Sequence, residues 1–219
     1  MDGNRRWAKQ KSLPVIAGHK EGVEALKKIT RYCLDNSISD LTVYAFSTEN
    51  WKRNSNELDF LFQLLSDVAL RELKDLRELG VKVDFIGDIS RFDKFDIQKN
   101  LNTLASETQV NSKLNMHIAL NYGSLAEIAK VLTEIKADMS IEEIEKLQIA
   151  DLNSRLYSKA SPEPDLLIRT GGQQRLSNFL LWQSTSSKLV FTETLWPDFS
   201  TDELTEIITN NTSKETIGV

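Results

Sequence analysis

Four clusters of polar residues in this sequence contain the side-chain types that bind phosphate groups. They combine arginines, glycines, hydroxyl groups and an acidic group suited to a divalent cation. The clusters are Asp2-Gly-Asn-Arg-Arg-Trp7, Ser47-Thr-Glu-Asn-Trp-Lys-Arg53, Asn121-Tyr-Gly123 and Arg169-Thr-Gly-Gly-Gln-Gln-Arg-Leu-Ser-Asn178. Arginine presents a planar fork of donors to phosphate oxygens, and glycine lets backbone N–H groups approach a phosphate closely. Since Mg²⁺ prefers one or two carboxylates together with substrate phosphates, the clusters predict a diphosphate site with bound Mg²⁺.

The elements that must position these clusters alternate between strands and helices. Segments rich in β-branched and aromatic residues predict strands at 40–47, 81–87, 114–120, 165–169 and 188–192. Apolar residues at three- and four-residue spacings predict helices at 21–36, 56–79, 92–108 and 125–137, and Ser140 with Glu143 has the spacing of a capping box. This alternation favours an α/β fold, a single domain over 1–219 with a mainly parallel central β-sheet flanked by helices.

Ligands of an open parallel sheet bind beyond the carboxyl ends of its strands, which is where the clusters stand. For any single arginine in such a loop, solvation or pairing with a nearby acid is an equally good interpretation. The same chemistry repeated in four clusters makes that interpretation much weaker. The sequence therefore predicts one phosphate-binding edge rather than scattered surface charges.

The composition is typical of a globular intracellular protein. The 219 residues include 27 lysines and arginines against 32 aspartates and glutamates, a net charge of 27 − 32 = −5, and 40% are hydrophobic. This balance excludes disorder by composition, and a pI near 5.2 argues against a nucleic-acid partner. Cys33 is the single cysteine, and we identify neither a secretory signal nor an apolar run of ~20 residues. We expect a cytoplasmic protein in a reducing compartment.

A wider set of short strings occurs in a fixed order along the chain. The strings are Met1-Asp-Gly-Asn-Arg-Arg-Trp-Ala8, Gly18-His19-Lys20, Tyr44-Ala-Phe-Ser-Thr-Glu-Asn-Trp51, Ile86-Gly-Asp88, Asn121-Tyr-Gly123, Ile168-Arg-Thr-Gly-Gly172, Arg175-Leu-Ser-Asn-Phe-Leu-Leu-Trp-Gln183 and Leu195-Trp-Pro-Asp-Phe199. Together they closely resemble the cis-prenyltransferases, specifically the bacterial undecaprenyl diphosphate synthases. Each string alone is weak, but the ordered set, from Met1 to about Phe199, is highly specific.

The resemblance implies an activity. In that family, isopentenyl diphosphate condenses repeatedly onto farnesyl diphosphate to give a long-chain polyprenyl (undecaprenyl) diphosphate, the precursor of the lipid carrier for cell-wall glycan synthesis. It further implies Mg²⁺ as cofactor, a homodimer, delivery of the product to the membrane with peripheral membrane association, and no nucleic-acid partner.

The resemblance also implies roles for individual residues. Asp2 would hold Mg²⁺ and assist departure of the allylic diphosphate, and Asn50 would help to remove a proton. The residues expected to bind substrate are Gly3, Asn4, Arg5, Arg6, Trp7, His19, Ser47, Thr48, Glu49, Trp51, Arg53, Arg169, Arg175 and Ser177. Among these, Arg169, Arg175 and Ser177 resemble the family's clamp on isopentenyl diphosphate. His19 is expected in a loop, and Glu57 is expected to help position the site.

An apolar stripe on the predicted helix 56–79 has two interpretations. Its residues are Leu58, Leu61, Phe62, Leu65, Val68, Ala69, Leu73 and Leu76. It either packs in the core or, as the resemblance implies, lines a dry tunnel for a growing prenyl chain. The sequence leaves both open. Two other residues, His117 in a strand and Cys33 on an apolar helix face, are expected to be structural.

The chain departs from the family pattern in four places. Only Met1 precedes Asp2, where the family has a short apolar strand, and the tail from about residue 200 lacks the usual arginine-rich terminus. Lys188 stands where the family has a glutamate near Mg²⁺, and Val15 stands where an arginine is frequent. Two alternatives to a long-chain synthase therefore remain. One is a relative that makes short, branched or cyclised products, and the other is a catalytically weak subunit that stabilises an active partner.

Overall fold

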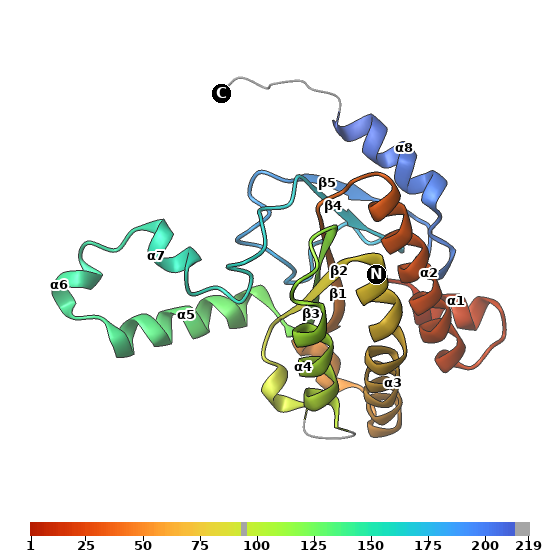
Figure 1. Cartoon of the computed structure of the whole chain (residues 1–219), viewed down its shortest axis with the longest axis horizontal. Coiled ribbons are helices and arrows are strands. Elements are labelled where there is room, and N and C mark those ends of the chain that lie inside the picture. Colours follow the sequence, from red (N-terminus) through yellow and green to blue (C-terminus); the bar gives the residue numbers. More distant parts are fainter. Residues whose placement is uncertain (93–95, 213–219) are drawn as a thin grey trace. The chain divides into compact units, whose positions relative to one another are not determined.

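The computed structural model describes residues 1–92 and 96–212. Residue contacts group the chain into two compact units. Unit 1 comprises Met1–Ile38, Glu163–Leu176 and the chain from Gln183, and unit 2 comprises Ser39–Pro162 and Ser177–Trp182. Figure 1 labels the helices and strands of both units.

Unit 2 is built on a parallel three-stranded sheet. Its strands are β1 (Asp40–Ser47), β2 (Val81–Ile86) and β3 (Leu114–Tyr122), in the order β1-β3-β2. The register aligns Ser47 at the end of β1 with Tyr122 at the end of β3. Polar residues that follow these strands therefore emerge at one carboxyl edge.

Helices and short turns follow each strand of unit 2. They are η1 (Thr48–Lys52), α3 (Ser55–Leu79), η2 (Ile89–Arg91), α4 (Ile97–Thr108), α5 (Ser124–Asp138), α6 (Ile141–Ile144) and α7 (Ile149–Asn153). In Figure 1, α3 and α4 lie side by side, and the two helices pack against each other. Helix α3 begins after Asn54, whose side chain accepts from the N–H of Glu57, and ends at Gly80, whose φ of 81° is left-handed.

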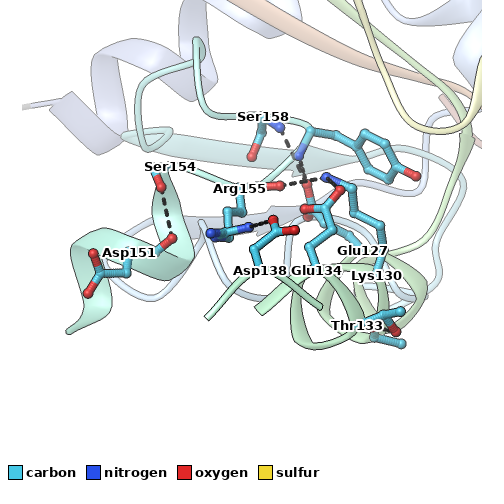
Figure 2. A network of polar contacts seen from close by, with 11 residues as sticks. Glu127, Lys130, Thr133, Glu134, Asp138, Asp151, Ser154, Arg155 and Ser158 are labelled. Atoms are coloured by element: carbon cyan, nitrogen blue, oxygen red, sulfur yellow. Dashed lines mark hydrogen bonds and ion pairs between the residues drawn. The ribbon is translucent and has the colours of Figure 1, made fainter. Parts of the chain in front are cut away.

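A buried glutamate attaches the loop after α7 to α5 (Figure 2). The side chain of Glu127 is fully buried, and its Oε2 accepts a 2.7 Å hydrogen bond from the hydroxyl of Tyr122. Its Oε1 accepts from the backbone N–H groups of Tyr157 (2.8 Å) and Ser158 (3.3 Å). Nearby, Nζ of Lys130 donates to the backbone oxygen of Arg155 at 2.8 Å. Glu127 thus satisfies two backbone N–H donors, and Lys130 satisfies one backbone carbonyl oxygen, in the loop after α7.

A buried histidine ties all three strands of unit 2 together. His117 on β3 is 3% exposed, and its Nδ1 lies 2.5 Å from Oδ1 of Asp84 on β2. Its Nε2 lies 3.2 Å from Oδ1 of Asp40 on β1. Burial acts to lower the pKa of His117, but the hydrogen bonds and charges of the two carboxylates outweigh it, so the pKa lies above its usual value. The structural role predicted for His117 fits this geometry.

Unit 1 combines a parallel strand pair with helices. Its elements are α1 (Asn4–Gln10), α2 (Val15–Asp35), β4 (Leu166–Arg169), β5 (Lys188–Phe191), η3 (Trp196–Asp198) and α8 (Thr201–Thr212). Close packing of α1 on α2 requires glycine, because a Cβ at Gly18 would lie 2.0 Å from the backbone oxygen of Asn4. Cys33 is buried on α2, as predicted, and burial raises the pKa of its thiol to about 11.

The predicted α/β fold with parallel strands and flanking helices is confirmed. The five predicted strands all form, although they are distributed over two sheets of three and two strands. The expected helix 92–108 includes positions 93–95, which lie outside the described residues, and α4 begins at Ile97. None of the described helices is both long and apolar enough to cross a membrane.

One structural prediction was wrong. Helix α2 begins at Val15, six residues before the expected start, so His19 lies in a helix rather than in a loop. Gly18 suggested a loop at His19, but Gly18 and Gly22 both face α1, where a Cβ would meet atoms of Asn4. The glycines are therefore explained by close packing. The sequence interpretation also missed α1, α7 and α8.

Candidate active site

Two arginines flank the carboxylate of Asp2 in unit 1. Oδ2 of Asp2 lies 3.1 Å from Nη2 of Arg169, and Oδ1 lies 3.3 Å from Nη2 of Arg6. The Arg169 side chain is 14% exposed, whereas those of Asp2 and Arg6 are 38% and 45% exposed. A carboxylate and two guanidinium groups thus lie together at a partly exposed place on unit 1.

The backbone around Asp2 is held by the chain that follows β4. The N–H of Asp2 donates to Oγ1 of Thr170 at 3.0 Å, and the Thr170 hydroxyl donates back to the Asp2 carbonyl at 2.9 Å. The same carbonyl accepts from the N–H of Trp196 at 3.0 Å. Gly171, with a φ of 88°, completes the turn, and a Cβ there would lie 2.5 Å from Nη2 of Arg6. The positive φ and the Asp2 carbonyl oxygen, 3.1 Å from the position of such a Cβ, favour glycine at this turn.

The charge of Asp2 is set by these neighbours. Partial burial acts to raise the pKa of Asp2, but the hydrogen bond from Arg169 and the positive charges of Arg6 and Arg169 outweigh it. The pKa of this carboxyl therefore lies below its ordinary value. Asp2 is ionised near neutral pH, as a metal ligand must be.

The remaining clamp residues of unit 1 lie on the same turn. A guanidinium nitrogen of Arg169 donates to the backbone oxygen of Arg175, and the exposed Arg175 side chain contacts Gln173. Gly172 has a φ of 72°, and a Cβ there would lie 2.3 Å from Oε2 of Glu193. Sequence reasoning missed Glu193, although it stands two residues after β5 and the rule about carboxyl ends of strands could have found it.

Lys188 is the first residue of β5, paired with Leu166. Strands rise ~3.3 Å per residue, so Lys188 lies ~10 Å before the end of β5 at Phe191. A side chain at position 188 therefore lies at the opposite end of β5 from the turn beside Asp2 in the same chain. Val15, the other internal departure, is the half-buried first residue of α2.

Other predicted residues of unit 1 lie on α1 and α2. Gly3 precedes α1 with a φ of 119°, and Arg5 is exposed. Trp7 is buried, and its Nε1 donates to Oδ1 of Asp198 at 2.7 Å, which anchors α1 to η3. Asn4 packs against Gly18 and Gly22, and His19 is half-buried. Substrate contacts by these residues stay predictions.

In unit 2, η1 carries the second group of predicted residues. Ser47 and Asn50 form a capping box around η1, in which Oδ1 of Asn50 accepts from the N–H of Ser47 at 3.0 Å. Thr48 lies beside Gly123, where a Cβ would approach its Oγ1 to 2.7 Å. The carboxylate of Glu49 accepts from Nδ2 of Asn178, the residue after Ser177. The structure thus brings η1 and the chain next to Ser177 together.

Aromatic packing and an ion pair fix the end of η1. Nε1 of Trp51 donates to Oδ1 of Asn121 at 2.7 Å, and its ring lies 5.3 Å from the ring of Phe62 on α3. Nη1 of Arg53 lies 2.8 Å from Oε1 of Glu57, whose side chain is 10% exposed. The positioning role expected for Glu57 fits this ion pair, which holds the Arg53 guanidinium.

The residues around Asp2 fit a magnesium ion that is shared with substrate. No group of three or more histidine, cysteine, aspartate or glutamate side chains that could hold a metal occurs within residues 1–92 and 96–212. Mg²⁺ is commonly held by one or two carboxylates, waters and substrate phosphates rather than by a protein cage. A single ionised carboxylate between arginines that can bind phosphate suits that arrangement.

Comparison with known proteins shows the family of this chain. A family model described as putative undecaprenyl diphosphate synthase matches residues 1–216. An isoprenyl transferase from Heliobacterium mobile is 43% identical over 210 residues, which is 95% of this chain and 80% of that protein. A ditrans,polycis-undecaprenyl-diphosphate synthase, (2E,6E)-farnesyl-diphosphate specific, from Micrococcus luteus is 44% identical over 214 residues, covering 95% and 84%.

Two solved structures share the fold. Lavandulyl diphosphate synthase from Lavandula x intermedia, in complex with dimethylallyl diphosphate, has a TM-score of 0.91 at 30% identity and covers 98% of this chain and 93% of its own. A probable undecaprenyl diphosphate synthase from Campylobacter jejuni has a TM-score of 0.78 at 32% identity, with 90% of each chain covered. The fold is that of a prenyltransferase. The chain belongs to the undecaprenyl diphosphate synthase family.

Proposed function

We propose that this chain condenses isopentenyl diphosphate repeatedly onto farnesyl diphosphate to make a long-chain polyprenyl diphosphate of the undecaprenyl type. Such a product would serve as precursor of the lipid carrier for cell-wall glycan synthesis. The observation that carries the proposal is the Asp2 carboxylate set between Arg169 and Arg6 at a glycine turn. A carboxylate beside two guanidinium groups that can bind phosphate suits a leaving diphosphate and its metal ion.

The proposed step exchanges one bond for another. The bond between C1 of the allylic substrate and its diphosphate breaks, and the double bond of isopentenyl diphosphate supplies the electron pair of the new carbon–carbon bond. A proton then leaves C2 of the former isopentenyl unit, and the electrons of the broken C–H bond form the new cis double bond. Arg5 and Arg6 would bind the departing diphosphate, and Arg169, Arg175 and Ser177 would bind isopentenyl diphosphate. Asn50 would orient the proton acceptor.

Mg²⁺ is proposed as the cofactor, with Asp2 as its protein ligand. When bound, it would neutralise charge that develops on the departing diphosphate. Arg5 and Arg6, which would bind that diphosphate, act in the same sense, because fixed positive charges stabilise the additional negative charge that develops on it in the transition state.

Helix α3 supports a long product. Of its apolar stripe, Phe62 and Ala69 are buried, whereas Leu58, Leu61, Leu65 and Val68 are only half-buried. Ordinary core residues would be buried throughout. A half-buried apolar face suits a wall against which a prenyl chain grows.

A product-length assay tests the proposal. Purified protein is incubated with labelled isopentenyl diphosphate, farnesyl diphosphate and Mg²⁺, and products are resolved by chromatography. We expect long cis-polyprenyl products that disappear when the metal is chelated. Turnover that persists with a chelator would reject the metal role, and no turnover with any allylic diphosphate would reject the synthase.

A second candidate function is the synthesis of short or branched products. The fold similarity to lavandulyl diphosphate synthase, with a TM-score of 0.91, favours it. The same assay, run with dimethylallyl diphosphate as the allylic substrate, separates the two candidates. Turnover that requires a second, different chain would instead indicate the weak subunit suggested by Lys188 and Val15.

Homodimer formation is proposed with unit 2 in the interface. Ile141 is 77% exposed, Ile149 68% and Leu132 55%, and all three lie on α5–α7. Exposed apolar side chains in one region are typical of an interface. Ile141→Lys should lower the molar mass measured by light scattering, whereas Val110→Lys, at a 90% exposed position of unit 2, should not.

Cytoplasmic location with peripheral membrane contact is also proposed. The exposed Lys9 and Lys11 stand beside Leu13 (44% exposed) and Ile16 (42%) at the turn between α1 and α2. Basic and apolar side chains together suit an anionic lipid surface. The protein should sediment with phosphatidylglycerol vesicles but not with phosphatidylcholine vesicles, and Leu13→Ser should weaken sedimentation.

A further inference from the structure

Asn178 connects three segments at the carboxyl edge of the unit 2 sheet. Its Oδ1 accepts a 2.8 Å hydrogen bond from the backbone N–H of Leu125, and its Nδ2 donates one of 3.1 Å to Oε1 of Glu49. Its backbone oxygen accepts a third, of 2.8 Å, from the N–H of Ser124. One residue thus joins the segment next to Ser177 to the first turn of α5 and to η1.

The side chain at position 178 must both accept and donate a hydrogen bond. The N–H of Leu125 requires an acceptor and the carboxylate of Glu49 requires a donor, which asparagine alone among residues of its size supplies together. Ser177 and Asn178 also have φ angles of 48° and 63°, in the left-handed region that asparagine tolerates better than most residues. An aspartate would keep the acceptor and lose the donor.

The surroundings leave the amide little freedom. A Cβ on Gly123, the residue before α5, would lie 2.6 Å from Nδ2 of Asn178 and 2.7 Å from Oγ1 of Thr48. The N–H of Leu181 donates to Oγ of Ser124 at 3.1 Å, so segment 177–182 is attached to α5 at a further point. Ser177 itself is exposed. The arrangement fixes the backbone on both sides of an exposed serine.

Glu49 is the acceptor that makes the connection to η1. Partial burial acts to raise the pKa of Glu49, but hydrogen bonds, from Asn178 first and from η1 itself, outweigh it. The pKa of this carboxyl therefore lies below its ordinary value, and Glu49 is a carboxylate near neutral pH. The hydrogen bond from Nδ2 of Asn178 to this carboxylate is charge-assisted, and such bonds are stronger than hydrogen bonds between two neutral groups.

We propose that Asn178 is a positioning residue that holds Ser177 in register with η1 through Glu49. It acts through these two residues rather than by touching substrate. The inference rests on the proposed function for the identity of the ligand, because only the family resemblance assigns Ser177 to isopentenyl diphosphate. The geometry itself requires no such assignment.

The test is a charge swap across the hydrogen bond. Asn178→Asp keeps the acceptor for Leu125 at a helix N-terminus, where a negative charge is favourable, and sets two carboxylates against each other at Glu49. We expect the KM for isopentenyl diphosphate to rise on the order of 10- to 100-fold, with the KM for farnesyl diphosphate unchanged. Adding Glu49→Gln to this variant restores a donor opposite the new carboxylate and should recover most of the loss.

The controls separate positioning from folding and from function. Asn102→Asp adds the same charge at an exposed site on α4 and should leave both KM values unchanged. Thermal unfolding of Asn178→Asp should match the parent within a few degrees. Unchanged kinetics in Asn178→Asp, or no recovery in the double variant, would overturn the proposal.

A parent protein that shows no turnover would reject the proposed function instead. The positioning role is then judged by calorimetric binding of inorganic diphosphate to the same proteins. The expected order of affinity is the parent first, the double variant next and Asn178→Asp last. Equal affinities would overturn the proposal.

Discussion

Replacing Asp2 by asparagine tests the centre of the candidate site while keeping its shape. The carboxylate lies 3.1 Å from Arg169 and 3.3 Å from Arg6, but the side chains of Asp2 and Arg6 are 38% and 45% exposed. Water screens such pairs, which typically contribute ~0–1 kcal/mol each. The amide also keeps an acceptor oxygen. We therefore expect the free energy of unfolding to fall by about 1 kcal/mol or less, a shift in Tm of roughly 2–4 °C.

Turnover should fall far more than stability. Asp2→Asn removes the charge that would hold Mg²⁺ beside the departing diphosphate, and losing one such electrostatic contribution costs about 10²- to 10³-fold in kcat, ~2.7–4 kcal/mol. The KM values should stay level or decrease, because Arg6 and Arg169 lose the anion that competes with phosphate. The large loss in kcat and the small loss in stability are predicted together.

The assay measures kcat and KM for both diphosphates over a Mg²⁺ titration, with thermal unfolding in parallel. Asp35→Asn, at the exposed last residue of α2 in the same unit, is the matched control and should behave like the parent. Near-parental turnover of Asp2→Asn at saturating Mg²⁺ would refute the assignment. A loss of several kcal/mol in the free energy of unfolding would show that Asp2 is mainly a structural partner of the arginines.

Three further predictions concern single side chains. Arg169→Ala should raise the KM for isopentenyl diphosphate by roughly 10- to 100-fold, since a hydrogen bond to a charged group contributes ~1.5–3 kcal/mol, and a defect confined to farnesyl diphosphate would reverse the subsites. Glu127→Ala should lower the free energy of unfolding, measured in urea, by ~3–5 kcal/mol, because it leaves buried backbone N–H groups without their acceptor. Glu134→Ala, on the same helix and 39% exposed, is the control and should not show this loss. His117→Gln should lower the free energy of unfolding most at low pH. The contribution of His117 is complete below the ordinary histidine pKa of about 6.5 and is lost as pH rises through the higher pKa of the folded state. A difference in the free energy of unfolding that does not change with pH would contradict this prediction.

Local sequence signals were sufficient for the five strands and for helices α3 and α5, but not for α1, α7, α8 or the start of α2. Helix α3 could be predicted because Asn54 caps one end, Gly80 ends the other, and apolar residues recur between them at helical spacing. The strands could be predicted from runs of β-branched and aromatic residues. Since parallel strands carry their ligands at their carboxyl ends, this order also placed η1 and the turn after β4 as site candidates. Asp2, which only Met1 precedes, was a candidate because of its residue type and the family resemblance.

Only the tertiary structure decided which side chains of the site meet. Asp2 and Arg169 are 167 positions apart, and Asn178 and Glu49 are 129 apart. No local periodicity encodes such pairs, because they depend on strand order and on which backbone donors remain unpaired after the sheets form. The same reason applies to Gly18, which locally suggests a loop and in the fold is the contact that lets α1 approach α2. Spacing along the chain determined what each segment is, and packing determined what its side chains touch.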